Sequence, residues 1–168
     1  MPINIVLFQP EIPQNTGNIM RTCAGTNVKL HLIKPLGFSL DEKAVRRSGA
    51  NYVEHTDFSI YENFEDFREK NDGSYYISTR YGTHVPTEFD FSDSKENIYI
   101  IFGSESSGIP KEILMDYKDT CFRLPMNDKI RSLNLSNCAA IMIYEALRQQ
   151  NYNELLVKEP FKLGYLED

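Results

Sequence analysis

The stretch of sequence that decides the fold is Ile98-Tyr-Ile-Ile-Phe102-Gly103-Ser-Glu105-Ser-Ser-Gly108-Ile-Pro110. It opens on a run of β-branched and aromatic residues, which is typical of a strand that is covered on both faces. The run leads directly into a loop dense in glycine and serine. Because open α/β sheets bind ligands beyond the carboxyl ends of their strands, this stretch predicts a buried strand followed by a ligand-binding loop.

The same alternation of apolar runs and helical periodicity continues on both sides of this stretch. Strands are predicted at residues 5–8, 30–33, 75–79, 98–102 and 121–124, and helices at residues 41–48, 61–70, 111–117 and 135–149. Strands that alternate with helices are the pattern of a mainly parallel sheet flanked by helices. The predicted fold class is therefore α/β.

Length and composition fit one domain. A chain of 168 residues that is 41% hydrophobic can bury a substantial core but is too short for two domains of ordinary size. We expect a single domain over residues 1–168, with residues 157–168 as a C-terminal tail. Residues 82–96 are polar and contain a proline, which is typical of a linker-like segment. The tail from Lys158 carries apolar side chains such as Phe161, so we expect it to pack down, on this chain or on a partner subunit.

Composition also limits the class of protein. The first residues lack the features of a signal peptide, and no apolar run approaches the roughly 18 residues that a membrane span needs. A cytoplasmic protein without a membrane partner is expected. The three cysteines form no Cys-x-x-Cys pair, which argues against a disulfide framework or a zinc site. The three histidines are scattered and are expected to be ordinary core or surface residues rather than metal ligands: His31, His55 and His84.

The net charge is −6 and the sequence pI is near 5.1. This balance argues against a protein that coats nucleic acid through bulk positive charge. Local basic clusters can still bind phosphate groups. The sequence offers two of them, Lys43 with Arg46 and Arg47, and Lys129 with Arg131.

A second candidate loop follows the strand at residues 5–8 and reads Pro10-Glu-Ile-Pro-Gln-Asn15-Thr-Gly-Asn18-Ile-Met-Arg21. One interpretation is structural, with Asn15 or Asn18 capping the next helix. The other is functional, with Arg21 placed one turn into that helix. There it would share a phosphate or ribose ligand with the backbone N–H groups of the helix start.

The loop at residues 103–110 holds two glycines, Gly103 and Gly108, that permit close approach of the backbone to a ligand. It matches neither a dinucleotide fingerprint nor a P-loop. Glu105 between the glycines would repel an anion, so a cationic or hydroxyl-bearing ligand suits this loop better.

A third loop reads Leu124-Pro-Met126-Asn-Asp-Lys129-Ile-Arg131-Ser132-Leu-Asn134-Leu-Ser136-Asn137 and leads into the longest helix. It contains more capping residues than one helix start requires. Capping alone and a site for a polar small molecule both remain open. Since all three loops follow strands, they can meet in one pocket at the carboxyl edge of the sheet.

Together the three motifs resemble the signatures of the SPOUT methyltransferases, and more narrowly the single-domain tRNA (cytidine/uridine-34) 2′-O-methyltransferases. The resemblance extends from Ile5 to the helix that ends near Gln149, and the stretch Pro35-Leu-Gly-Phe38 supports it. It implies a deep trefoil knot near the C-terminal end, a homodimer, S-adenosylmethionine as cofactor and tRNA as partner. The implied reaction is methylation of the ribose 2′-hydroxyl of the wobble nucleotide, with leucine tRNAs as substrates.

The resemblance also implies roles for individual residues. The implied catalytic residues are Arg21, Asn15, Glu105, Ser132 and Asn134. The implied cofactor shell is Ile77, Ser78, Thr79, Gly103, Gly108, Leu124, Met126 and Ser132. The residues expected to bind RNA are Arg21, Arg46, Arg47, Lys129 and Arg131, and no metal is expected.

Because a guanidinium stays protonated in proteins, we expect Arg21 to hold the substrate phosphate and ribose oxygen while the proton leaves to water or another acceptor. Glu105 would orient the site.

Two alternative functions remain, a ribose methyltransferase for another tRNA or rRNA position and a noncatalytic RNA-binding dimer. An ordinary doubly wound nucleotide-binding enzyme would need a phosphate loop after the first strand, which residues 10–15 do not form.

Overall fold

The computed structural model describes residues 2–40, 55–93, 95–161 and 164. In these residues one six-stranded sheet has the strand order β3-β2-β1-β5-β4-β6, and all neighbouring strands are parallel. The strands are β1 (Ile3–Phe8), β2 (Lys29–Ile33), β3 (Phe58–Tyr61), β4 (Ser74–Ser78), β5 (Ile98–Phe102) and β6 (Cys121–Phe122). Each strand therefore ends at the same edge of the sheet.

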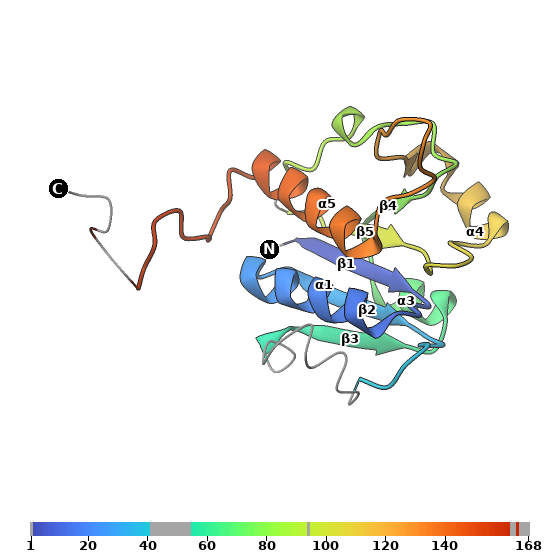
Figure 1. Cartoon of the computed structure of the whole chain (residues 1–168), viewed down its shortest axis with the longest axis horizontal. Helices are drawn as coiled ribbons and strands as arrows, with labels where there is room; N and C mark the ends of the chain where they lie inside the picture. Colours follow the sequence, from blue (N-terminus) through green and yellow to red (C-terminus); the bar gives the residue numbers. More distant parts are fainter. Residues whose placement is uncertain (1, 41–54, 94, 162–163, 165–168) are drawn as a thin grey trace.

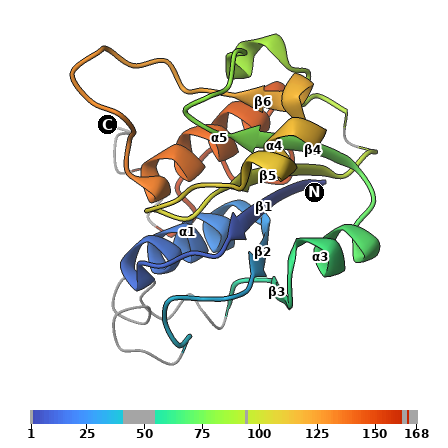
Figure 2. The same cartoon turned by 90° about the vertical axis from the view of Figure 1, so that its right-hand side faces the viewer.

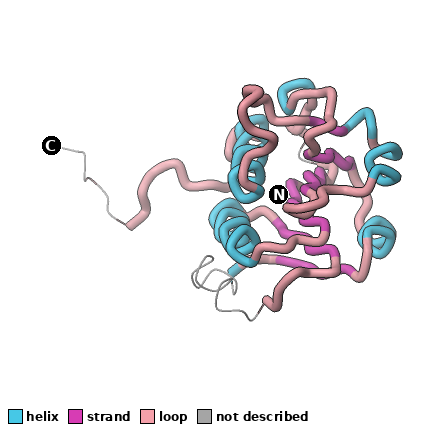
Figure 3. Tube along the Cα trace, turned by 45° about the vertical axis from the view of Figure 1, so that its right-hand side comes forward, coloured by secondary structure: helices cyan, strands magenta, loops and turns pink. Residues whose placement is uncertain are grey.

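Helices cover both faces of this sheet. Helices α1 (Pro13–Thr26) and α5 (Leu135–Gln149) lie on one face, and α3 (Phe64–Lys70) and α4 (Lys111–Asp116) lie on the other (Figures 1 and 3). Two short 3-10 helices, η2 (Pro86–Glu88) and η3 (Lys118–Thr120), lie in connections. The arrangement confirms the predicted α/β class. Among the described residues, no helix is long and apolar enough to cross a membrane.

The buried core has one part on each face. Every residue of β1 is buried, and its side chains alternate between the two faces. Ile5 and Leu7 pack with Met142 of α5 on the first face, and Val6 packs with Phe67 of α3 on the second. Because β1 and β5 lie in the middle of the sheet, the loops that follow them are held by the most buried part of the molecule.

The element bounds agree with prediction where the sequence pattern is strong. β5 and α5 have the predicted bounds, whereas β3 was not predicted. The predicted helix at residues 61–70 begins later, because Tyr61 belongs to β3 and the Asn63 side chain accepts a hydrogen bond from the Asp66 N–H at 2.8 Å. The predicted helix at residues 41–48 lies outside the described residues.

The segment at residues 82–96 is not a linker, so that prediction is wrong. Phe91 is fully buried, and its N–H donates to Gln149 Oε1 of α5 at 2.7 Å. Its carbonyl accepts from Gln150 Nε2 at 2.8 Å. The segment therefore covers the end of the sheet near β4 and β6, and its aromatic side chains supply the apolar area that holds it there.

The tail leaves the body of the molecule after α5 (Figures 1 and 3), whereas the view of Figure 2 looks along it. Val157 is 91% exposed and Phe161 is 94% exposed. The prediction that the tail from Lys158 packs down on this chain is therefore wrong for residues 158–161. Packing against a partner subunit remains a proposal.

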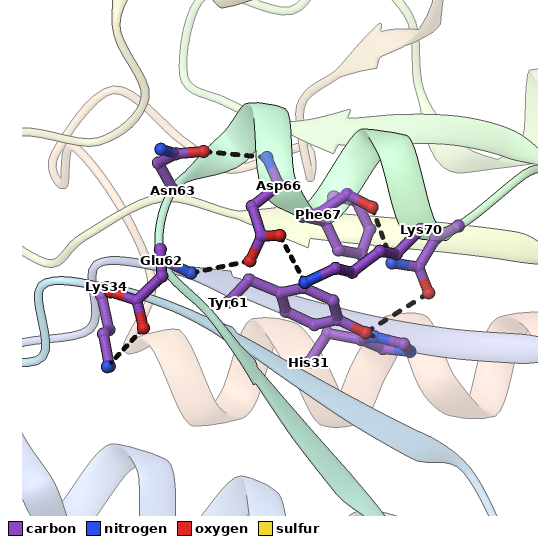
Figure 4. Close-up of polar contacts among 9 residues, drawn as sticks. His31, Lys34, Tyr61, Glu62, Asn63, Asp66, Phe67 and Lys70 are labelled. Atoms are coloured by element: carbon purple, nitrogen blue, oxygen red, sulfur yellow. Dashed lines mark hydrogen bonds and ion pairs between the residues drawn. The ribbon is translucent and has the colours of Figure 1, made fainter.

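His31 is an ordinary core residue, as predicted. It is buried on the α3 face, with Nδ1 2.8 Å from the Tyr61 hydroxyl (Figure 4). Its Nε2 lies 3.1 Å from Asn4 Oδ1. Burial, with a smaller contribution from the charge of Lys29, lowers the pKa of His31 to about 3. The neutral ring then donates from Nε2 to Asn4 and accepts at Nδ1 from Tyr61. Two ion pairs, Lys34–Glu62 and Lys70–Asp66, lie on the surface of this face.

Candidate active site

Three loops meet at the carboxyl edge of the sheet. The first loop, residues 9–12, joins β1 to α1; the second loop, residues 103–110, joins β5 to α4; and the third loop, residues 123–134, joins β6 to α5. Their strands are held in register, with Leu7 beside Phe102 and Ser78 beside both Phe102 and Phe122. The sheet therefore brings together motifs that are far apart in the sequence.

Glu105 joins the second loop to the first. Its Oε2 accepts the Glu11 N–H at 2.8 Å, and its Oε1 accepts the Ile12 N–H at 3.2 Å and Asn15 Nδ2 at 3.0 Å. Ile12 is the N-cap residue of α1 and has no side-chain cap of its own. The carboxylate therefore binds the main chain just before α1, where the partial positive charge of the helix start favours an anion.

Asn15 and Asn134 continue this network to the third loop. Asn134 Nδ2 donates to Asn15 Oδ1 at 2.9 Å. Asn134 Oδ1 in turn accepts the N–H groups of Ser136 at 2.9 Å and Asn137 at 3.3 Å, and so caps α5. Because the Glu105 carboxylate can only accept, it fixes the orientation of the Asn15 amide, which then fixes that of Asn134.

The second loop is tight because of its glycines. The Ser104 N–H donates to the Gly108 carbonyl at 3.3 Å, and the Gly108 N–H donates to the Ser104 carbonyl at 3.0 Å. A Cβ on Gly103 would lie 2.4 Å from the carbonyl carbon of Gly108, and Gly108 has a φ of +70°. Both positions therefore require glycine, as the spacing of these residues suggested.

The predicted cofactor residues come together on β4 and β6. Ile77 is buried and pairs with Cys121, and the Thr79 N–H donates to the Phe122 carbonyl at 2.9 Å. Leu124, just beyond β6, is buried. Ser78 and Met126 are half-buried beside them. Gly103 and Gly108 lie in the second loop, which follows the neighbouring strand β5. Ser132 is exposed, and its role as a catalytic and cofactor residue stays a prediction.

Arg21 lies farther along α1 than the sequence suggested. The helix begins at Pro13 because proline suits a first helical position, so neither Asn15 nor Asn18 is its cap. Arg21 is exposed and lies about 12 Å along the axis from that start, at about 1.5 Å per residue. The prediction that Arg21 lies one turn into the helix is therefore wrong, and a ligand shared with the N–H groups of the helix start stays a prediction.

The basic residues are placed as follows. Lys129 and Arg131 are exposed on the third loop, and Lys43, Arg46 and Arg47 lie outside the described residues. Among the described residues, no group of three or more His, Cys, Asp or Glu could hold a metal ion.

Sequence reasoning missed two features of this edge. Glu11 contacts the second loop, although nothing in its local pattern distinguishes it from an ordinary surface acid. Arg123 Nε is buried without a hydrogen-bond partner in the described structure, next to the predicted cofactor residue Leu124. A basic residue directly after an apolar strand is the only signal that the sequence gives for it.

Fold and site together define an α/β protein with a parallel sheet and three loops joined at its carboxyl edge. A crystal structure of a provisionally named RNA methyltransferase from Bacillus anthracis has 51% sequence identity and a TM-score of 0.88, covering 94% of this chain and 99% of that one. A structure described as giving insight into 2-OH methylation of C/U34 on tRNA has 37% identity and a TM-score of 0.81, covering 90% and 99%. The chain belongs to the SpoU rRNA methylase family, whose profile matches residues 2–144.

Named relatives extend over most of the chain. A protein of Listeria monocytogenes serotype 4b (strain F2365), provisionally named tRNA (cytidine(34)-2′-O)-methyltransferase, is 52% identical over 100% of both chains. The tRNA (cytidine(34)-2′-O)-methyltransferase of Saccharophagus degradans is 45% identical, covering 89% of this chain and 96% of its own. The SpoU methyltransferase AviRb from Streptomyces viridochromogenes, solved in complex with AdoMet, shares the fold with a TM-score of 0.76 and 18% identity, covering 88% of this chain and 57% of that one.

Proposed function

We propose that this protein uses S-adenosylmethionine to methylate the ribose 2′-hydroxyl of nucleotide 34 of tRNA, cytidine or a modified uridine, with leucine tRNAs as substrates. The names of the relatives support the reaction and the position. The observation that carries the proposal is the hydrogen-bonded link from Glu105 through Asn15 to Asn134, which joins three loops at one ligand-binding edge.

The residues at this edge fit the cofactor. S-adenosylmethionine supplies the activated methyl group when it is bound. Gly108 has open space where a Cβ would lie, which leaves its backbone uncovered, and Arg123 Nε is a buried donor that lacks a hydrogen-bond partner in the described structure. We assign the adenosine and methionine portions to backbone and side-chain groups of the predicted shell: Ile77, Ser78, Thr79, Gly103, Gly108, Leu124, Met126 and Ser132.

The chain's own residues orient the RNA and help the hydroxyl lose its proton. Arg21 holds the phosphate and ribose oxygen by paired, charge-assisted hydrogen bonds and stabilises the developing negative charge. Glu105 and Asn15 fix the first loop, which leads into the helix that bears Arg21. Asn134 fixes the start of α5, and the neighbouring Ser132 contacts the reacting ribose. The proton leaves to water or another acceptor, so most of the acceleration comes from positioning.

Exposed basic residues bind the tRNA backbone. Lys129 and Arg131 of the third loop are exposed. We assign phosphate contacts to them and to Arg46 and Arg47, which lie outside the described residues. With a net charge of −6, such local contacts must provide the phosphate binding. Affinity should therefore fall steeply with salt.

Three structural features belong to the proposal. The region from β6 to α5 closes a deep trefoil knot, which is supported by the hydrogen bond from the Arg123 N–H to the His84 carbonyl and by the packing of α5 on α1. Two copies form a homodimer that completes the cofactor sites, and the apolar tail packs on the partner. The protein works in the cytoplasm, where its tRNA substrate is found.

Mass-spectrometric mapping of 2′-O-methyl nucleosides in tRNA from cells with and without this gene tests the proposed reaction. We expect loss confined to position 34 of leucine tRNAs, and the purified protein should restore it. A leucine tRNA with a 2′-deoxy nucleotide at position 34 is the matched control, because it lacks only the accepting hydroxyl. An unchanged map, or no binding of S-adenosylmethionine in calorimetry, contradicts the proposal.

The second candidate function is ribose methylation of another tRNA position or of rRNA, which the description of the family favours. The same mapping applied to rRNA separates the two. A noncatalytic RNA-binding dimer predicts tRNA binding with an unchanged map in both kinds of RNA.

A further inference from the structure

Glu11 makes a contact that mirrors that of Glu105. Its Oε2 accepts the Ser106 N–H at 3.0 Å, and its Oε1 accepts the Ser106 hydroxyl at 2.6 Å. Ser106 directly follows Glu105, whose Oε2 accepts the Glu11 N–H at 2.8 Å. Each glutamate carboxylate therefore binds the main chain of the loop that carries the other glutamate. We call this pair of contacts the reciprocal clamp.

The first loop provides the fixed side of the clamp. The Gly37 N–H donates to the Pro10 carbonyl at 2.9 Å, and a Cβ on Gly37 would lie 2.8 Å from the Cα of Glu11. The main chain at Glu11 is thus held from behind by residues that follow β2. The second loop projects beyond β5, and Ser106 at its tip is exposed. The position of that tip therefore depends on the clamp.

A purely stabilising role does not account for these contacts. Glu11 and Ser106 are both exposed, and exposed charged contacts add little to the free energy of unfolding. What the clamp does fix is the distance between the two loops at the residue next to Glu105. Without the Glu11 carboxylate, Glu105 alone joins the tip of the second loop to the first loop.

We infer that Glu11 is a positioning residue, which holds the second loop so that Glu105 keeps the Asn15 amide in place for methyl transfer. The inference rests on the proposed methyltransferase function. It predicts that Glu11 acts through Glu105 and touches neither RNA nor cofactor.

The first test compares three variants in single-turnover methylation at saturating tRNA and S-adenosylmethionine. Glu11→Ala should lower the rate roughly tenfold, the effect of about one hydrogen bond to a charged group. Glu11→Gln should stay within about threefold, because its amide oxygen can accept the Ser106 N–H while its amide nitrogen donates to the Ser106 hydroxyl. Glu112→Ala, an exposed acid on α4, is the matched control and should not change the rate. Equal losses in the alanine and glutamine variants overturn the inference.

A double-mutant cycle asks whether Glu11 works through Glu105. In a Glu105→Ala background, adding Glu11→Ala should lower the rate by less than about twofold. If the two residues acted independently, the losses of the two single variants would multiply in the double variant. Multiplied losses overturn the inference.

Hydrogen exchange gives a readout that does not depend on activity. Amides of residues 103–108 should exchange roughly tenfold faster in Glu11→Ala than in the wild type, with α5 unchanged. Unchanged exchange in that loop overturns the inference, whatever the rates. If the wild-type protein fails to methylate tRNA, the proposed function fails, and the exchange result still decides whether the clamp holds the loop.

Discussion

Replacing Asn134 by aspartate separates two hydrogen-bonding tasks of one side chain. One carboxylate oxygen can still accept the N–H groups of Ser136 and Asn137, so α5 keeps its cap, and a negative charge at a helix start is favourable. Asn134→Asp keeps this cap and loses only the hydrogen bond to Asn15, so we expect its free energy of unfolding to fall by about 1 kcal/mol. Asn134→Ala loses the cap and that hydrogen bond together and should lose about 2 kcal/mol.

The other carboxylate oxygen of the aspartate meets the wrong partner. It faces Asn15 Oδ1, which in the wild type accepts from Asn134 Nδ2 at 2.9 Å. Asn15 cannot turn its amide to compensate, because its Nδ2 is held by Glu105 Oε1 at 3.0 Å. One hydrogen bond worth about 1 kcal/mol is lost and two oxygens repel each other, so methyl transfer should slow by roughly tenfold or more.

Two measurements on the same protein samples test this separation. Urea denaturation gives the free energy of unfolding, and single-turnover methylation of tRNA at saturating S-adenosylmethionine gives the rate. An aspartate variant that is as active as the wild type, or one that is destabilised as much as the alanine variant, refutes the directional network.

Three further predictions use other features. Gly103→Ala should abolish calorimetric binding of S-adenosylmethionine, because its Cβ would lie 2.4 Å from Gly108, while Gly25→Ala, with nothing within 4 Å, should bind normally. The pKa of His31 is lowered to about 3 against about 6.5 in the unfolded chain, so the unfolded chain takes up its proton first as pH falls. Between pH 6.5 and pH 5, the wild type should therefore lose about 1.5 kcal/mol more unfolding free energy than His31→Gln; parallel pH curves would contradict this. Removal of residues 157–168 should leave the unfolding midpoint unchanged if the tail makes no packing contacts. A sedimentation coefficient that falls by more than the lost mass explains would indicate that the tail packs on a partner subunit.

The strong patterns of the sequence predicted the central fold. β5 is a continuous apolar run and α5 has a clear apolar stripe, and both have the predicted bounds. β3 was missed because it lies at the edge of the sheet and is only partly buried, so its sequence lacks the apolar run of the central strands. The segment at residues 82–96 was misjudged because Pro86 and its polar residues outweighed Phe91, the residue that packs it down.

The candidate site could be predicted as a set of residues but not as a network. Asn15, Glu105 and Asn134 were all expected to be functional, and the structure joins them by hydrogen bonds. Which donor meets which acceptor depends on strand order, which no local pattern encodes. The start of α1 was misplaced because the helix begins at Pro13, ahead of Asn15 and Asn18, and the main chain before it is held by Glu105 from another loop. The roles of Arg21 and Ser132 stay predictions.

The separation in sequence between Asn15 and Asn134 has a consequence for biosynthesis. The two residues are 119 positions apart, yet their amides touch. At about 5 to 20 residues per second, a ribosome completes Asn134 roughly 6 to 24 s after Asn15. Throughout that interval the nascent chain already carries its N-terminal strand, but it lacks the partner that closes the network. A nascent chain that ends before Asn134 therefore cannot form the hydrogen bond that joins the third loop to the first.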